Sequence, residues 1–203
     1  MRDMFKSSKK FMPTYLLIAI NIAVYVYTSI IGGNFMETDY YVLLQYGQSN
    51  SFVMSGGYWQ LFTAMFVHVG LVHLLGNMFF LLIFGLRAED MFTIQEYLLI
   101  YLLSGLTGNL LTLLFGPDML SAGASGAIFG MFGAVTIFVR RAVGQSILSA
   151  LMYSFFLLMI NIGPNVNNLA HFGGLIIGLL IGYMLATKRK ITITYRYNYS
   201  YYK

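Results

Sequence analysis

The chain has 203 residues, of which 58% are hydrophobic and only 9% are charged. Soluble domains usually carry about 25% charged residues, so this composition excludes an ordinary water-soluble domain and makes the lipid bilayer the expected solvent. Cysteine is absent, which excludes disulfides and thiolate metal sites. The formal net charge of +5 raises nucleic-acid binding as an alternative, but the placement of the basic residues argues against it.

Apolar segments of the sequence predict six membrane-spanning helices. They are expected at 14–31, 71–86, 94–115, 124–139, 145–161 and 169–186. Their lengths are close to the ~20 residues that cross ~30 Å of hydrocarbon, and backbone groups in lipid must bond within their own segment, which favours helices. The first segment lacks a small-residue cleavage site, so we interpret it as a retained span and not a signal peptide. The predicted fold class is an all-α, six-helix membrane bundle.

The basic residues predict the orientation of this bundle. All twelve Lys and Arg residues fall on one side of the six spans, at the two ends of the chain and in the loops around Arg87 and Arg140. The positive-inside rule then places both termini in the cytoplasm of a multi-pass cell-membrane protein. We expect a basic tail at 1–13, a membrane domain at 14–186 and a basic, Tyr-rich tail at 187–203. Because the charge is a topology signal, no nucleic-acid partner is expected.

Residues 32–70 are expected to form a long first loop on the outer side. Three glycines interrupt its apolar sequence GGYWQLFTAMFVHVG (56–70), and the pair Tyr58–Trp59 is typical of a membrane interface. We expect part of this loop to lie half-submerged in the headgroup region.

Polar side chains lie near the outer ends of three expected spans. His73, Ser125 and His171 are each within about two residues of that end, so a rise of about 1.5 Å per residue puts them at one shallow depth. Asn77 follows His73 by one helical turn and shares its face. A single polar group in a span is more often a helix–helix hydrogen bond than a catalytic group. Four such groups at matching depth predict a common site.

Glycines recur every fourth residue after Ser125 and after His171, beginning with Gly126 and Gly174. Such small-residue stripes let membrane helices approach closely, and their usual meaning is packing alone. Here the packing would bring the serine and the histidine within hydrogen-bond reach. Gly123 is expected to turn the chain into the helix with dihedral angles that glycine tolerates.

These residues suit nucleophilic catalysis. A serine hydroxyl needs a neighbouring base to take its proton, and His171 is the expected base for Ser125. A tetrahedral intermediate needs hydrogen-bond donors, for which the Ser125 N–H, the Asn77 amide and the His73 ring are available. No outer-side carboxylate is placed by its spacing to orient the histidine. We therefore predict a Ser–His dyad and not a Ser-His-Asp triad.

The chain resembles the rhomboid family of intramembrane serine proteases, in its minimal six-span form. The resemblance lies in HVGLVHLLGN (68–77), GASGAIFG (123–130) and AHFGGLIIG (170–178), with lesser matches at Tyr58–Trp59 and GLRAED (85–90). It runs from about 57 to 183 and implies that Ser125 is the nucleophile and His171 the general base. It also implies an oxyanion hole of His73, Asn77 and the Ser125 amide.

Further expectations come from the same resemblance. Phe129, one turn after the serine, would stack on the catalytic histidine, while His68 and Glu89 would have structural roles. The sequence departs from the family at Gln60, where an arginine is usual, and this leaves the anchoring of the outer loop open. Family members cut transmembrane segments of other membrane proteins without a metal or cofactor. The expected substrates are therefore single-span membrane proteins, cut near the outer membrane boundary.

Several other classes of protein fit less well. A metalloprotease would want H-E-x-x-H, whereas His68 and His73 lie about 140° apart on a helix with no Glu between them. The G-x-S-x-G elbow of an α/β-hydrolase does not match G-A-S-G-A. A transporter or channel would want polar residues through the full depth of the bilayer, and here they form one shallow layer. A non-catalytic rhomboid relative that acts as a binding chaperone is the remaining alternative.

Overall fold

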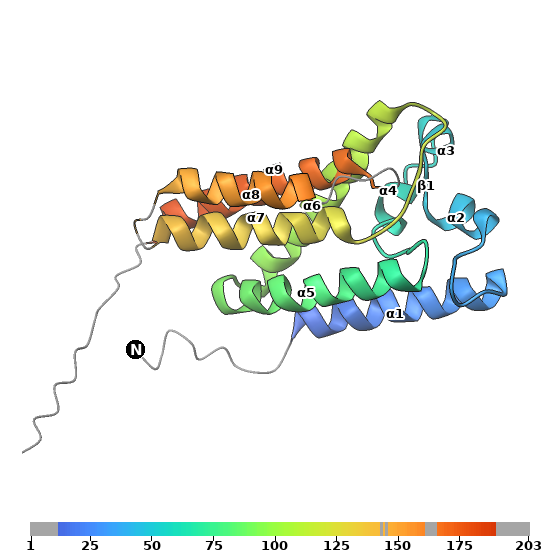
Figure 1. The fold of residues 1–203 in the computed structure, drawn as a ribbon, viewed down its shortest axis with the longest axis horizontal. Helices are drawn as coiled ribbons and strands as arrows, with labels where there is room; N and C mark the ends of the chain where they lie inside the picture. Colours follow the sequence, from blue (N-terminus) through green and yellow to red (C-terminus); the bar gives the residue numbers. More distant parts are fainter. Residues whose placement is uncertain (1–11, 143, 145, 161–165, 190–203) are drawn as a thin grey trace, which may run out of the picture.

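The computed structural model describes residues 12–142, 144, 146–160 and 166–189, and most of the two predicted tails lies outside them. In this part of the chain, helices lie side by side as a bundle (Figure 1). The long ones are α1 (Pro13–Gly32), α5 (Leu71–Met91), α6 (Ile94–Thr112), α7 (Ser125–Ala142), α8 (Ile147–Ile160) and α9 (Asn168–Lys188). Their positions correspond to the six segments expected from the sequence. The core lies between α5, α6 and α7, around the fully buried Leu81, Tyr101 and Met131.

In the part of the chain that the structure describes, four helices are long and apolar enough to cross a membrane: α1, α5, α9, and α6 together with the 3₁₀ turn that follows it at Leu113–Phe115. Among the described residues, α7 has 18 residues but carries Arg140 and Arg141 in its last turn, and α8 has 14. At 1.5 Å per residue, α8 spans about 21 Å, which is less than the ~30 Å of a hydrocarbon core. Large apolar side chains such as Val72 and Leu75 are exposed along these helices, as expected for a protein solvated by lipid.

The long first loop contains short elements that lie at one end of the bundle. The connection between α6 and α7, residues 113–124, lies at the same end (Figure 1). These elements are α2 (Tyr40–Tyr46), β1 (Gln48–Ser49), α3 (Asn50–Met54) and α4 (Gln60–Thr63). The strand β2 (Leu120–Ser121) pairs antiparallel with β1, so that Gln48 lies opposite Ser121. We refer to this end, which holds residues 33–70 and 116–124, as the loop end.

Gln60 anchors the first loop. Its side chain is 1% exposed, and its Oε1 accepts a hydrogen bond from the Ser49 N–H at 2.8 Å. Its Nε2 donates to the carbonyl oxygens of Leu44 at 2.7 Å and Gln45 at 3.2 Å. The uncharged amide therefore joins α4 to the segment around β1. The first loop is thus anchored by Gln60 itself, although an arginine is usual at this position.

Other carboxamides extend this framework to α6. Gln48 donates to Asn50 Oδ1 at 2.8 Å and to the carbonyl oxygen of Asn109 at 2.9 Å. Asn50 Nδ2 donates to the carbonyl oxygens of Thr112 and Gly116, both at 2.8 Å. Buried polar groups of this kind are stable only when they are hydrogen-bonded. The loops are therefore tied to the end of α6 by neutral groups whose bonds do not depend on pH.

Helices α7 and α9 approach each other backbone to backbone. A Cβ added at Gly174 would lie 1.9 Å from the carbonyl oxygen of Gly126, and one at Gly178 would lie 1.9 Å from that of Gly130. No real Cβ makes such a contact, so only glycine allows this separation of the helices. The stripes of small residues thus make the close helix contact that their spacing predicts.

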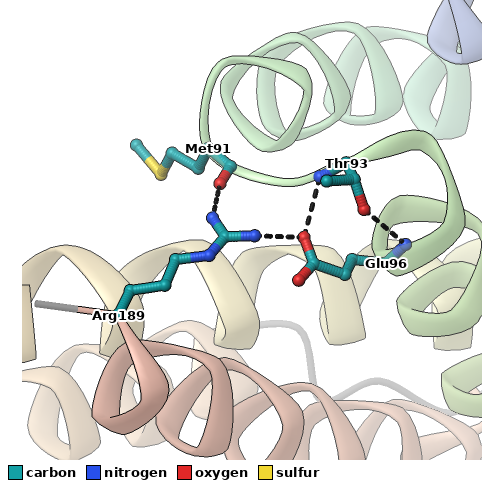
Figure 2. A network of polar contacts seen from close by, with 4 residues as sticks. All are labelled: Met91, Thr93, Glu96 and Arg189. Carbon is teal, nitrogen blue, oxygen red and sulfur yellow. Dashed lines mark hydrogen bonds and ion pairs between the residues drawn. The ribbon is translucent and has the colours of Figure 1, made fainter. Parts of the chain in front are cut away.

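The end of the bundle opposite the loop end is held by a polar network (Figure 2). Arg189, which follows α9, donates to the carbonyl oxygen of Met91 and forms an ion pair with Glu96. Glu96 and Thr93 form the capping box that starts α6. On the same side, the Glu89 carboxylate accepts a hydrogen bond from the Thr14 N–H at 2.7 Å and so joins α5 to the start of α1.

Candidate functional site

Ser125 and His171 meet at the loop end of α7 and α9. His171 Nε2 lies 2.9 Å from Ser125 Oγ, and the imidazole tautomer decides which atom donates. Ser125 is the first residue of α7, while His171 lies within the first turn of α9, directly above the Gly126–Gly174 contact. Within the described residues, the buried Nδ1 of His171 has no hydrogen-bond partner. In the described part of the chain, the arrangement is therefore a serine–histidine pair with no carboxylate hydrogen-bonded to the histidine.

Phe129 covers one face of the His171 ring. The two ring centroids are 4.4 Å apart and the planes are 18° from parallel. Phe129 lies one turn after Ser125 on α7, so one helix carries both the hydroxyl and the ring that limits how the imidazole tilts. Together these contacts define the orientation of the imidazole toward the serine.

His73 and Asn77 lie on the same face of α5, across from Gly123. Asn77 Nδ2 donates one of its two hydrogens to the carbonyl oxygen of His73 at 3.0 Å, which leaves the other free to point elsewhere. Gly123 has a φ of +135°, and a Cβ there would lie 2.7 Å from Cε1 and 3.1 Å from Nε2 of His73. Glycine is therefore required both for the turn and for the approach of this imidazole.

A cavity of about 450 Å³ connects these groups. Its polar lining contains Ser125, His171, His73, Asn77 and Asn167, and its apolar lining contains Phe80, Phe84, Phe129 and Phe132. Loop residues 119–123 line it as well. An apolar cavity with a few convergent polar groups is the usual form of a site that binds and orients a ligand.

Backbone N–H groups at the start of α7 add to the polar lining. The first N–H groups of a helix have no partner inside it, and Ser125 provides the first of them. The Gly123 N–H, in contrast, already donates to the carbonyl oxygen of Ala64 at 2.8 Å. This bond fixes the strand-to-helix turn and leaves the Ser125 N–H as the donor nearest to the hydroxyl.

His68 lies behind the cavity and does not line it. Its side chain is fully buried and meets the ring of His73 edge to face, with centroids 5.3 Å apart. Burial, and next the charge of His73, lowers the pKa of His68 to about 3. His68 is therefore neutral at physiological pH and packs against His73 from outside the cavity.

The structure adds Asn167 to the residues singled out from the sequence. It caps α9 by accepting a hydrogen bond from the Ala170 N–H at 2.9 Å, and it lines the cavity. The sequence did carry a signal for this role, because Asn directly before an apolar helix is a common N-cap.

As for metals, no group of three or more His, Asp or Glu side chains in the described ranges is placed to hold an ion.

Comparison with known proteins places this chain in a family. Residues 55–188 match the family profile described as Rhomboid domain. The chain is 41% identical over 133 residues to RHOMBOID-like protein 6, mitochondrial, of Arabidopsis thaliana. The aligned region covers 63% of this chain and 43% of that protein. It is 36% identical over 178 residues to Rhomboid protease GluP of Bacillus subtilis, covering 81% of this chain and 33% of GluP.

A second protein of Bacillus subtilis, Putative rhomboid protease YdcA, is 35% identical over 144 residues, which cover 68% of this chain and 72% of that protein. The chain thus spans less than half of the Arabidopsis relative and a third of GluP. The fold and site define a multi-pass helical membrane protein with a serine–histidine cavity. This chain belongs to the rhomboid family.

Proposed function

We propose that this protein is an intramembrane serine endopeptidase in which Ser125 is the nucleophile and His171 the general base. The observation that carries the proposal is the 2.9 Å contact between Ser125 Oγ and His171 Nε2 inside a cavity lined by hydrogen-bond donors. Membership of the rhomboid family supports it, since two of the relatives carry the word protease in their names.

In the proposed first half-reaction, Ser125 Oγ attacks the carbonyl carbon of the scissile peptide bond while His171 Nε2 takes the hydroxyl proton. The tetrahedral intermediate then collapses, and His171 gives that proton to the leaving nitrogen, which departs as an amine. An acyl ester on Ser125 is left. In the second half-reaction, His171 takes a proton from water, the resulting hydroxide attacks the ester, and the proton returns to Ser125 Oγ as the carboxylic acid leaves.

The oxyanion of each intermediate is proposed to bind between α5 and the start of α7. Three donors face this part of the cavity: the His73 ring, the second N–H of Asn77 and the Ser125 N–H. Neutral donors in a site shielded from water stabilise developing negative charge without adding a counter-ion. Because Nδ1 of His171 has no partner in the described part of the chain, the dyad is proposed to rely on Phe129 for orientation.

The membrane setting is also part of the proposal. We propose that α7 and α8 complete six spans, and that residues 14–186 form the membrane domain between the cytoplasmic tails 1–13 and 187–203. In the cell membrane, the loop end then faces outward, with the first loop half-submerged, and substrates are single-span proteins cut near that boundary. Helix-breaking residues in a substrate favour cleavage, because the peptide must leave its helical form to reach Ser125.

Covalent labelling tests the proposal. The purified protein in detergent is exposed to a fluorophosphonate probe, which reacts only with an activated serine. Labelling of the wild type, with none in Ser125→Ala and His171→Ala, is the expected result. Absence of labelling in a folded wild type would instead favour a binding role without catalysis. Cleavage of a model transmembrane substrate by the wild type, and not by Ser125→Ala, then distinguishes peptide hydrolysis from labelling alone.

A further inference from the structure

The side chain of Asn167 connects three elements at the loop end. Its Oδ1 accepts the Ala170 N–H at 2.9 Å, while its Nδ2 donates to Thr112 Oγ1 and to Ser121 Oγ, both at 2.7 Å. One carboxamide therefore uses its acceptor and both of its hydrogens. Through these bonds, the start of α9 is joined to the last residue of α6 and to β2.

The Thr112 partner requires a donor at position 167. Thr112 Oγ1 donates its own proton to the carbonyl oxygen of Gly108 at 2.9 Å, so it can only accept from Asn167. Thr112 is fully buried, so loss of the Asn167 donor leaves its Oγ1 with an acceptor position that no other described residue fills. A carboxylate at position 167 would cap α9 equally well but would place an acceptor against an acceptor here.

Asn167 is linked by hydrogen bonds to the segments that carry both members of the proposed catalytic pair. Its carbonyl oxygen accepts the His171 N–H at 3.2 Å, so it belongs to the same turn as the proposed base. Its other partner, Ser121, lies on the strand that leads through Gly123 into Ser125. The glycine contacts between α7 and α9 set how far apart these helices are. These glycine contacts do not involve β2, so other groups must set the position of the first turn of α9 relative to this strand.

We propose that Asn167 is a positioning residue that holds the first turn of α9, and with it His171, at hydrogen-bond distance from Ser125. The inference rests on the proposed function. Asn167 takes no part in proton transfer and acts through the helix start that it joins to α6 and β2. Displacement of a reacting group by about 1 Å is enough to slow an enzymatic step on the order of 100-fold. The expected loss therefore appears in kcat, with KM for a transmembrane substrate little changed.

The test compares three substitutions by their rate of fluorophosphonate labelling and by kcat and KM for a model transmembrane substrate. Asn167→Asp keeps the helix cap and loses the donors, Asn167→Ala loses both, and Thr112→Val removes one acceptor. Each is expected to reduce labelling and kcat on the order of 10- to 100-fold. The double variant of Asn167→Ala with Thr112→Val should be no slower than the slower single variant, because both remove one shared interaction.

Asn50→Ala is the matched control. It removes the hydrogen bonds to the carbonyl oxygens of Thr112, at the same end of α6, and of Gly116, together with the one that its Oδ1 accepts from Gln48 Nε2. Its side chain bonds neither α9 nor β2. Its labelling rate should stay close to that of the wild type, even where its thermal midpoint falls as far as that of Asn167→Ala. A rate loss in Asn50→Ala that equals the loss in Asn167→Ala would reduce Asn167 to a general stability role and overturn the inference.

Two further outcomes separate the inference from the proposed function. Suppose that Asn167→Asp and Thr112→Val label at the wild-type rate while Ser125→Ala is not labelled. This result would overturn the positioning role of Asn167 and leave the protease assignment intact. A folded wild type that does not label would overturn the protease assignment itself. If Asn167→Ala does not fold, Thr112→Val decides alone, because the cap on α9 is intact in that variant.

Discussion

Phe129 and His171 are stacked, with ring centroids 4.4 Å apart and planes inclined by 18°. The aromatic ring comes from the helix that carries Ser125, so the hydroxyl and the face that supports the imidazole move as one unit. Stacking of this kind contributes about 0.5–1.5 kcal/mol beyond the burial of area. In the proposed dyad, where Nδ1 of His171 has no hydrogen-bond partner among the described residues, the stack restrains ring tilt.

Replacement of Phe129 should therefore separate ring orientation from cavity packing. Phe129→Tyr keeps the ring and should retain most of the labelling rate, whereas Phe129→Leu keeps apolar bulk, loses the stack and should be slowed about 2- to 10-fold. Fluorophosphonate labelling rates of the two variants make the comparison. Equal rates for Leu and Tyr would show that the stack has no effect on the imidazole.

Asn77 is expected to act on the transition state and not on substrate binding. Asn77→Ala removes the free N–H that faces the cavity and should reduce kcat on the order of 100-fold, with KM little changed. Steady-state kinetics on a model transmembrane substrate measure both. Unchanged kcat in a folded variant would remove Asn77 from the proposed oxyanion hole.

The contact between Gly174 and Gly126 makes both stability and activity sensitive to one methyl group. Gly174→Ala must push α9 away from α7, because its Cβ would lie 1.9 Å from the Gly126 carbonyl oxygen. We expect a lower thermal midpoint and loss of labelling. Gly76→Ala on α5 is the matched control for stability, since a Cβ there meets nothing within 4 Å and should not lower the midpoint. Equal midpoints for the two variants would contradict the tight helix contact.

The buried His68 is expected to lower the free energy of unfolding of the protein in acid. Its pKa is lowered to about 3 in the folded protein, mainly by burial and then by His73, while an unfolded chain has a value near 6.5. The unfolded state therefore binds more protons between these values, and stability falls as the pH drops below about 6.5. The loss between about pH 7 and pH 5 amounts to about 2 kcal/mol.

Thermal or chemical unfolding of the detergent-solubilised protein at a series of pH values measures this slope. His68→Gln removes the titrating group and should flatten the dependence, whatever its effect on stability at neutral pH. The same slope in the variant and the wild type would assign the acid sensitivity to other groups.

Much of the fold could be read from local patterns. Hydropathy predicts the positions of the long helices, and the structure has a helix at each, because an apolar segment and its intrahelical hydrogen bonds are properties of consecutive residues. Spacing predicts the close contact of α7 and α9 in the same way, since residues four apart share a helix face. The count of six spans, the orientation and the catalytic roles stay predictions.

The short elements of the first loop and their anchors could not be read in this way. Gln60 was visible only as a departure at an expected arginine, and its three hydrogen bonds to β1 and the end of α2 depend on where those segments fold. Asn167 was a plain polar residue before a helix. Its bonds join residues 55 and 46 positions away, at Thr112 and Ser121.

Composition and residue spacing are enough to show that the chain is a helical membrane protein and that small residues follow both Ser125 and His171, and they predict that the polar groups share one depth. These are consequences of composition and of helical repeat. The folded chain was needed to show that His171 Nε2 and Ser125 Oγ, from residues 46 positions apart, lie 2.9 Å from each other, and that Asn167 is the carboxamide that joins the start of α9 to β2. A hydrogen bond needs its partners within about 3.5 Å, and no local pattern specifies a distance between segments that only the folded bundle brings together.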